Sequence, residues 1–137
     1  MSVTYTKVTY TIQEKLQAII NDEYRSVYIS SEYVDLGDEN VRIYITGNSD
    51  IETSNVFEER LLEGEIVFYY KDQDPIRREK FIKNRSDRLK QLLLNNQNIT
   101  EWYDLEIPDI TYGVDDEIDG LGFAQFSITV KSYNQWS

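Results

Sequence analysis

The first apolar pattern along the chain has the spacing of an amphipathic helix. Aliphatic residues recur at intervals of three and four between residues 12 and 20, so they fall on one helical face. Thr11 is followed three residues later by Glu14, the arrangement of a capping box, which satisfies free amides in the first turn of a helix. We therefore predict a helix over residues 12–22. Its apolar stripe consists of Ile12, Leu16, Ile19 and Ile20.

Two alternating segments follow this helix. Residues 25–30 and residues 40–46 carry an aliphatic side chain at every second position, which is the period of a strand with one buried face. Residues 36–40 and 46–50 are rich in Gly, Asn and Asp, which form turns because they tolerate positive φ and hydrogen-bond locally. The pattern predicts two half-buried strands punctuated by turns, as in a meander. The inward positions are Val27 and Ile29, then Val41, Ile43 and Ile45.

The middle of the chain contains one ambiguous stretch and one strong strand signal. Residues 49–63 include VFEERLLEG, which could begin a helix but lies between strand signals and ends at Gly64, so we expect a loop with at most a turn of helix. Residues 65–71, EIVFYYK, are apolar at both alternating sets of positions. This pattern, rich in β-branched and aromatic residues, predicts a central strand covered on both faces.

A long helix is predicted from residue 75 to residue 94. Asp74 and Pro75 match an N-cap and a first helical position, and Asn95 and Asn96 follow the last apolar residue. The residues between them are strong helix formers, with an apolar stripe on one face and most Lys and Arg side chains away from it. The stripe consists of Ile82, Leu89, Leu92 and Leu93.

The last third of the sequence predicts a β-hairpin. Residues 102–112 form one arm and residues 121–132 the other, and GVDDEIDG joins them. On the second arm apolar and polar residues alternate strictly, which indicates burial of one face. Pro108 interrupts the first arm and indicates an edge strand or a bend. The apolar set is Ala124, Phe126, Ile128 and Val130, and the polar set is Gln125, Ser127, Thr129 and Lys131.

These elements predict a single domain over residues 1–137 with an α+β fold, in which a mainly antiparallel sheet of about five strands packs against two helices. The chain has neither Cys nor His, which excludes disulfides, thiol nucleophiles, thiolate metal sites and the commonest general base. Carboxylates, Lys, Tyr and Ser could still build a hydrolase or an oxygen-ligand metal site, but no spacing demands either. We expect a protein that is not an enzyme and has no cofactor or metal.

The chain shows no targeting signal. No window approaches the apolar length of a membrane span, and the opening MSVTYTKVTYTIQEK lacks the apolar core of a secretory signal. We expect a protein that is made and kept in a cytoplasm.

Charge is distributed unevenly along the sequence. The net charge is −11, from 14 basic and 25 acidic residues. Residues 75–90 hold seven of the basic residues and only two acidic ones, so this segment is +5 and the rest of the chain is −16. The overall acidity opposes general affinity for nucleic acid. The separation of charge instead suits head-to-tail association, in which the basic helix of one copy faces an acidic surface of the next.

The order of helix, three strands, long helix and two terminal strands resembles that of the tail terminator (tail-completion) proteins of tailed bacteriophages. The likeness is carried by the opening helix TIQEKLQAII, by the strand EIVFYYK leading through DQDP into the long charged helix, and by the closing strand AQFSITVKS. It covers nearly the whole chain. The resemblance implies an antiparallel sheet packed against two helices, in a structural virion protein without catalytic residues.

The same resemblance implies a homo-oligomeric ring, expected to be a hexamer, which stops polymerisation of the tail tube and joins the tail to the head. The implied partners are the tail tube protein and a head-completion or neck protein, with DNA passing through the ring without sequence-specific binding and no membrane involved. The implied location is the virion tail or neck, after assembly in the host cytoplasm. Two alternatives remain: another head–tail joining protein, or a small nucleic-acid-binding module that uses the basic helix 75–94.

The basic helix therefore has three interpretations: a solvated face, a subunit contact, or a surface for nucleic acid. The hairpin tip DDEIDG partly resembles a calcium loop, but Phe126 stands at the twelfth position, where a bidentate Glu is required. We prefer an acidic solvated tip, which in a ring could project into the lumen or towards a neighbour. The candidate subunit-contact residues are Arg77, Arg78, Lys80, Arg85 and Arg88 on the helix, and Asp115, Asp116 and Glu117 in the tip.

Aromatic residues are abundant, with eleven Tyr and two Trp. This is more than one small core needs, and such side chains are enriched at protein interfaces. Tyr28, Tyr44, Tyr69 and Tyr70 fall in predicted strands, where we expect core or sheet-surface positions.

Overall fold

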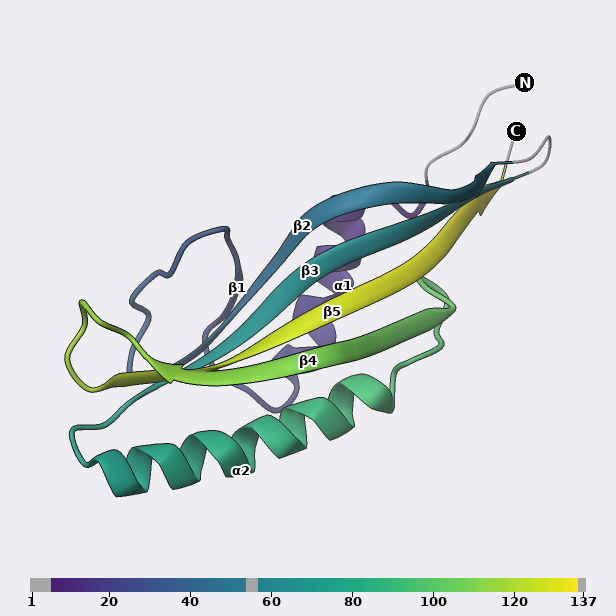
Figure 1. Cartoon of the computed structure of the whole chain (residues 1–137). Helices are drawn as coiled ribbons and strands as arrows, with labels where there is room; N and C mark the ends of the chain where they lie inside the picture. The colour runs from purple at the N-terminus through teal and green to yellow at the C-terminus, as the bar shows by residue number, and fades with distance from the viewer. Residues whose placement is uncertain (1–5, 54–56, 136–137) are drawn as a thin grey trace.

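The computed structural model describes residues 6–53 and 57–135, and these residues form the α+β fold that the sequence predicts, with two helices and one mostly antiparallel five-stranded sheet. The strand order across the sheet is β1-β2-β3-β5-β4 (Figure 1). The elements in chain order are α1 (Thr9–Asn21), β1 (Val27–Ile29), β2 (Glu39–Thr53), β3 (Phe57–Lys71), α2 (Pro75–Leu94), β4 (Asp104–Val114) and β5 (Leu121–Gln135).

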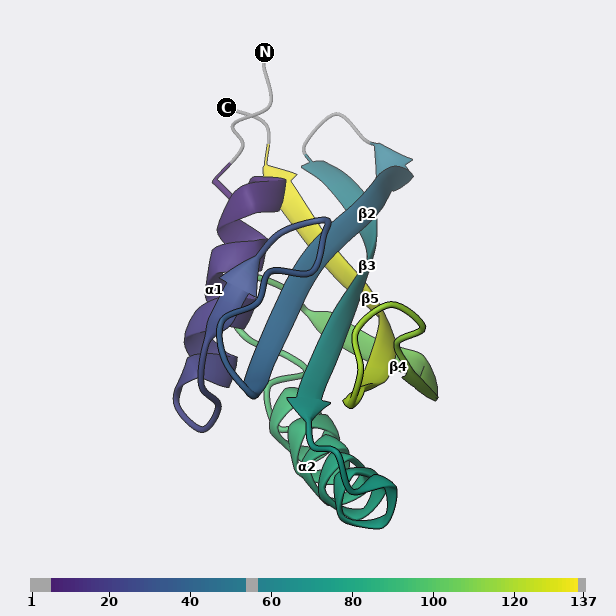
Figure 2. The same cartoon turned by 90° about the vertical axis from the view of Figure 1, so that its left-hand side faces the viewer.

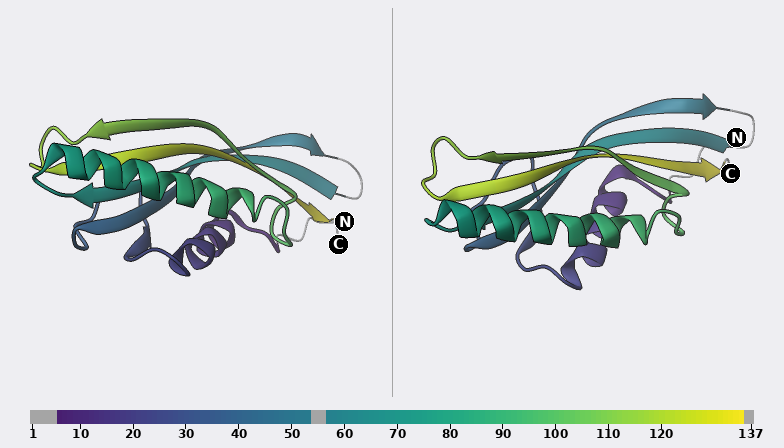
Figure 3. Two further views of the ribbon diagram at one scale, coloured as in Figure 1. Left: turned by 90° about the horizontal axis from the view of Figure 1, so that it is seen from below. Right: turned by 60° about the horizontal axis from the view of Figure 1, so that its bottom comes forward.

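Both helices pack on the same face of the sheet (Figure 3). The apolar stripe of α1 is buried there, with Ile12, Leu16 and Ile20 fully inaccessible. They join one continuous core with Phe68 of β3, which lies opposite Ala124, and with Phe126 of β5, which lies opposite Ile66. Of the predicted inward residues, Val41, Ile43 and Ile45 are confirmed as buried core and Val27 packs against it half-buried, whereas Ile29 is half-buried and belongs to neither apolar cluster of the described residues.

The first connection of the sheet differs from the predicted meander. β1 pairs with β2 in parallel, with Val27 opposite Val41, whereas the other three strand pairs are antiparallel. Parallel pairing is possible because the segment between the two strands, residues 30–38, is long enough to run back along the edge of the sheet before β2 begins. The predicted turn is present within this segment at Gly37, whose φ of 116° favours glycine.

A long β2–β3 pairing replaces the loop expected over residues 49–63. The two strands pair from Glu39 opposite Tyr70 out to Thr53 opposite Glu58, so the turn predicted at residues 46–50 is also wrong. Gly, Asn and Asp here accommodate register shifts, between Ile45 and Gly47 and again further along, and do not reverse the chain. The helix-like VFEERLLEG becomes strand because β5 pairs along it. Residues 54–56 of the expected loop lie outside the described residues.

The two helix starts have different causes. Pro75–Leu94 matches the prediction, and the Asp74 carboxylate accepts the amides of Ile76 and Arg77 at 3.0 and 3.2 Å. The capping box predicted for α1 is wrong, because that helix begins at Thr9, and Thr11 already lies inside it. The chain entering α1 is instead fixed by a distant contact, in which the Asn134 side-chain oxygen accepts the amides of residues 6 and 7 at 3.1 and 3.0 Å.

The C-terminal hairpin is confirmed. β4 is an edge strand that pairs antiparallel with β5, and Pro108 lies within a register shift between Glu106 and Asp109, as a proline at an edge should. The four apolar residues predicted to share a face of β5 are buried, and the four polar ones on the opposite face are half-buried.

Among the described residues, one small apolar cluster covers the opposite face of the sheet at one end. Val67 and Tyr69 of β3 are buried there with Leu121, beneath Tyr33 of the β1–β2 loop and Ile118 of the hairpin tip. This small second cluster confirms that EIVFYYK is a central strand covered on both faces. Tyr28, Tyr44 and Tyr70 are half-buried strand residues, as predicted.

Candidate functional site

Helix α2 presents most of its cations away from the sheet, but Arg78 is half-buried and packs against Gly122 of β5. Ile82, Leu89 and Leu93 are buried against the core, as predicted, and Leu92 is partly buried beside them. Ser86 completes the buried row, and its hydroxyl bonds back to the Lys83 carbonyl at 3.0 Å, as serines inside helices commonly do. The packing of this apolar row leaves Arg77, Lys80 and Arg88 exposed, whereas Arg78 and Arg85 are half-buried.

The first of these cations is clamped at the start of its own helix. Arg77 donates two hydrogen bonds to the Asp72 carboxylate, at 2.6 and 2.9 Å, a bidentate geometry. The Arg77 guanidinium holds the pKa of Asp72 at about 2, below its ordinary value of 3.8, and the amide of Asp74 adds to the effect. The carboxylate in turn raises the pKa of Arg77.

Two further cations tie α2 to the end of α1. Arg88 pairs with Glu23 and lowers the pKa of that carboxylate, mainly through their hydrogen bonds. Arg85 donates to the Glu23 carbonyl at 3.1 Å and to the Glu39 carboxylate at 3.3 Å, and its guanidinium lies 4.1 Å from the centroid of the Tyr24 ring. Burial raises the pKa of Tyr24 to about 12. Both arginines therefore have structural partners within the chain.

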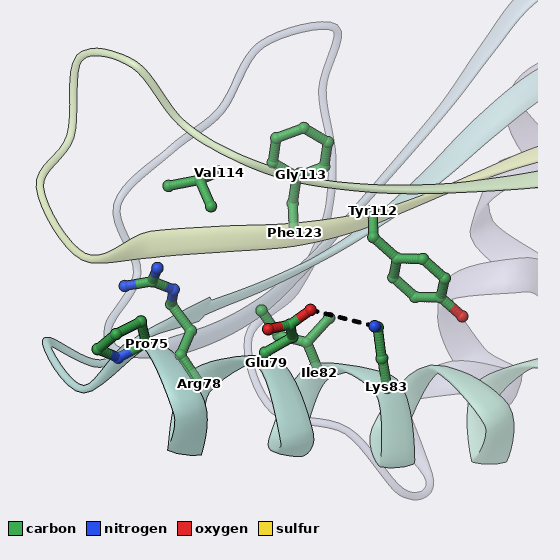
Figure 4. Close-up of a pocket in the computed structure, with 9 residues that line it drawn as sticks. All are labelled: Pro75, Arg78, Glu79, Ile82, Lys83, Tyr112, Gly113, Val114 and Phe123. Carbon is green, nitrogen blue, oxygen red and sulfur yellow. Dashed lines mark hydrogen bonds and ion pairs between the residues drawn. The ribbon is translucent and has the colours of Figure 1, made fainter.

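A groove separates the N-terminal half of α2 from the β4–β5 hairpin (Figure 4). It has a volume of about 210 Å³. Two cations border it: Arg78 donates to the Asp72 carbonyl at 3.0 Å, and Lys83 pairs with Glu79 at 3.1 Å and lies 5.6 Å from the Tyr112 ring centroid. We call this feature the helix groove, and its lining consists of Pro75, Arg78, Glu79, Ile82, Lys83, Tyr112, Gly113, Val114 and Phe123.

The acidic hairpin tip lies beside the start of α2 (Figure 1). The amide of Asp72 donates to the carbonyl of Gly120 at 2.9 Å, which fixes the tip there. Within the tip, the Asp115 carboxylate accepts the amides of Glu117 and Ile118 at 2.8 and 2.9 Å, so this side chain serves the turn. The carboxylates of Asp116 and Glu117 are exposed.

The structure thus divides the predicted site residues into three groups. Arg78 lines the helix groove, and the tip residues 115–117 directly follow its lining residue Val114. Arg85 and Arg88 lie further along α2 at the α1 contact, and Arg77 and Lys80 are exposed on its outer side. Neither the calcium interpretation nor a converging acid–base pair gains support, because the shifted carboxylates each face an arginine.

One surface feature was not identified from the sequence. Residues 30–38 form a loop along the β1 edge, with Val34 and Leu36 exposed at 43% and 45%. The signal was present as EYVDLGDE, where apolar residues alternate with carboxylates. Turn chemistry accounts only for residues 36–40, and nothing in the sequence shows that this loop lies on an outer edge of the sheet.

Comparison with protein-family models gives no match, and comparison with curated proteins gives no significant similarity. Within the described residues, neither helix is long and apolar enough to cross a membrane, and no group of three or more acidic residues is placed to hold a metal ion.

Proposed function

We propose that this chain is a structural virion protein that forms a ring at the head-proximal end of a phage tail tube, stops tube polymerisation and helps to join the tail to the head. The observation that carries the proposal is the arrangement of elements. An opening helix and a long charged helix lie on one face of a mainly antiparallel sheet closed by a C-terminal hairpin, which is what the resemblance to tail terminator proteins implies.

The shape of the sheet supports head-to-tail assembly. Its two edges are unlike, since β1 has only three residues and carries an acidic loop, whereas β4 has eleven and borders the basic helix. Unlike edges give heterologous contacts, which close into a ring when the rotation between copies allows it. The proposed partners are further copies of the chain, expected to number six, the tail tube protein and a head-completion protein. DNA would pass through the opening without sequence-specific binding.

A nucleic-acid-binding role for the basic helix is less well supported. Arg77, Lys83, Arg85 and Arg88 all pair with carboxylates of the same chain, so phosphate would have to displace internal partners. Phe81, the aromatic residue of this helix, stacks on Tyr70 with ring centroids 4.0 Å apart and is occupied within the fold. A different neck or head–tail joining role would use the same ring and differ only in its neighbours.

Native mass spectrometry of the purified chain, alone and with its tube protein, tests the proposal. Six copies of 16.2 kDa give an expected mass of about 97 kDa. Added to polymerising tube protein, the chain should shorten the tubes and appear at one end in electron micrographs. A strictly monomeric mass over a wide concentration range, with and without tube protein, would contradict the proposal. Retardation of DNA with a steep salt dependence would favour the nucleic-acid alternative.

A further inference from the structure

We infer that neighbouring copies contact one another through the loop of residues 30–38, here called the acidic loop, which enters the helix groove of the next copy. The inference rests on the proposed ring and names the surfaces that would build it. Three observations carry it: the matched chemistry of the two surfaces, the ordered conformation of the loop, and their positions on opposite edges of the sheet at the same level.

The acidic loop combines exposed apolar side chains with unbalanced negative charge. Val34 and Leu36 project from it with 43% and 45% of their surface exposed. Glu32, Asp35 and Asp38 are exposed beside them, and the loop contains no basic residue. Such a segment is suited to a basic groove with an apolar floor.

The loop is held in place by the rest of the molecule. The ring of Tyr33 packs edge-on against Tyr69, with centroids 4.6 Å apart. The Val34 amide donates to the Tyr28 hydroxyl at 2.9 Å, and Arg42 donates to the carbonyl of residue 30 at 3.1 Å. Because these contacts already order the loop, binding through it would cost little conformational entropy.

The helix groove offers the complementary surface. Tyr112 and Val114 of β4 line it and remain 42% and 53% exposed, so an apolar partner would bury surface that water now covers. Arg78 and Lys83 stand on its helix side (Figure 4). Its only lining carboxylate, Glu79, pairs with Lys83, so the lining carries a net charge of +1 against −3 for the loop.

The two surfaces lie at the same level on opposite edges of the sheet. A single row of paired residues crosses the sheet from Tyr112 through Ala124, Phe68 and Val41 to Val27. The groove lies at the β4 end of this row, where Tyr112 lines it. The acidic loop follows β1 at the other end (Figure 2). A step perpendicular to the strands, combined with a rotation that carries the loop from the face opposite the helices to the helix side, brings the groove of one copy to the loop of the next, which is a heterologous contact.

The acidic hairpin tip restricts how the loop can enter. Asp116 and Glu117 are exposed and follow Val114, a lining residue of the groove, by two and three positions along the chain. Like charges brought together there would repel, so the loop carboxylates are directed towards the Lys83 end. The tip thus helps to fix the register of the contact and does not form part of it.

Disulfide trapping tests the contact directly, because the chain contains no Cys and engineered thiols are its only ones. The variant with both Leu36→Cys and Val114→Cys should give, after mild oxidation, a ladder of covalent oligomers on a non-reducing gel. Each single variant should give almost no dimer, because a head-to-tail contact never brings two copies of the same residue together. Ile51→Cys with Val114→Cys is the matched control, since Ile51 is 46% exposed but lies on the β2–β3 hairpin. This pair should give no ladder.

Charge exchange provides an independent test that does not depend on thiol geometry. Asp35→Lys and Lys83→Glu should each raise the midpoint concentration of assembly by at least about tenfold, and the double variant should recover most of the loss. Lys90→Glu, at the far end of the same helix, should assemble like the parent. Thermal unfolding of each variant shows whether the monomer is intact. Loss of assembly without recovery in a folded double variant would overturn the inference.

The outcomes also separate this inference from the proposed function. An assembled protein that yields no ladder, or that forms dimers from a single Cys variant, would overturn the contact while leaving the ring in place. A ladder that grows into open filaments without a closed species would support the contact and contradict the tail-terminator role. A protein that stays monomeric under every condition would overturn both.

Discussion

Leu89 illustrates how single residues hold α2 against the sheet. Its side chain is fully buried in the main core, next to Ile82 and Leu93 of the same helix. Leu89→Ala removes buried methyl groups and leaves a cavity, so we expect the free energy of unfolding to fall by about 2–5 kcal/mol. Chemical denaturation measures the change, with Leu94→Ala as the control at a 38% exposed leucine. Equal stabilities of Leu89→Ala and the parent would contradict the observed orientation of the helix.

Two glycines on the paired strands β2 and β3 offer a matched comparison of backbone packing. A Cβ at Gly64 would lie 2.7 Å from the Tyr44 carbonyl oxygen and 3.1 Å from the Ile45 Cα, both main-chain atoms that cannot rotate away. At Gly47 nothing lies within 4 Å of such a Cβ. We expect Gly64→Ala to lower the free energy of unfolding by roughly 1–3 kcal/mol, as overpacking does.

Gly47→Ala should leave thermal unfolding close to that of the parent, because its new methyl group points into open space. Should Gly47→Ala be the more destabilising of the two, the register shift beside it would have to depend on glycine, and close strand packing at Gly64 would not be the limiting factor.

At the scale of whole elements, α2 and β5 could be predicted because their information is local. The Asp74-Pro75 pair and the apolar stripe define α2, and strict alternation defines β5, without reference to distant residues. The full lengths of β2 and β3 could not be predicted, because residues 46–53 have little strand propensity and become strand by pairing with β3. The start of α1 depends on Asn134, more than one hundred residues away, which no local signal reveals.

In the candidate site, too, local features could be predicted from the sequence and contacts between distant residues could not. Its cations were placed on the correct side of α2, since helical periodicity determines which face the apolar stripe buries. Their partners were not predicted: Glu23 and Glu39 lie 65 and 46 residues from the arginines that they bind. The helix groove could not be foreseen either, because its two walls come from α2 and from the β4–β5 hairpin.

The ion pair at the start of α2 makes the attachment of this element depend on pH. Because the folded pKa of Asp72 is lowered to about 2, from an ordinary value of 3.8, the pair stabilises the fold above about pH 4 and loses its effect as the pH falls towards 2. Arg77→Gln should raise the pKa of Asp72 towards its ordinary value, as followed by carboxyl NMR titration. Lys80→Gln, one turn along the exposed side, is the control and should leave that pKa unchanged.

Asp74 limits the size of this effect. Its amide also donates to the Asp72 carboxylate, at 3.0 Å, and this bond remains in Arg77→Gln. The Asp72 pKa should therefore stay somewhat below 3.8 in the variant. An unchanged titration curve would mean that Arg77 does not hold the carboxylate in solution.

At the scale of the whole molecule, the internal ion pairs show that the separated charges along the sequence partly bind one another within the fold. Four cations of α2 bind carboxylates within the chain, and three of these carboxylates, Asp72, Glu23 and Glu39, belong to the strongly acidic remainder. Part of the +5 of this segment therefore serves to dock α2 onto α1 and β2. Arg78, which donates to a backbone carbonyl, lines the groove, where it would meet the acidic loop of a neighbouring copy.

The salt dependence of assembly decides between charge and apolar burial as the main attraction in this contact. Exposed charge pairs are screened over roughly 10 Å at 0.1 M ionic strength, so assembly driven by the Lys83 side of the groove should weaken several-fold as sodium chloride rises from low to moderate concentration. A double variant, Asp35→Asn with Lys83→Gln, should assemble more weakly at low salt and depend less on salt. Sedimentation velocity across a concentration series measures both. The parent could instead assemble more strongly in sulfate and show no dependence on sodium chloride. Apolar burial would then be the main attraction, because excluded salts favour it. The exposed apolar residues are Val34, Leu36, Tyr112 and Val114.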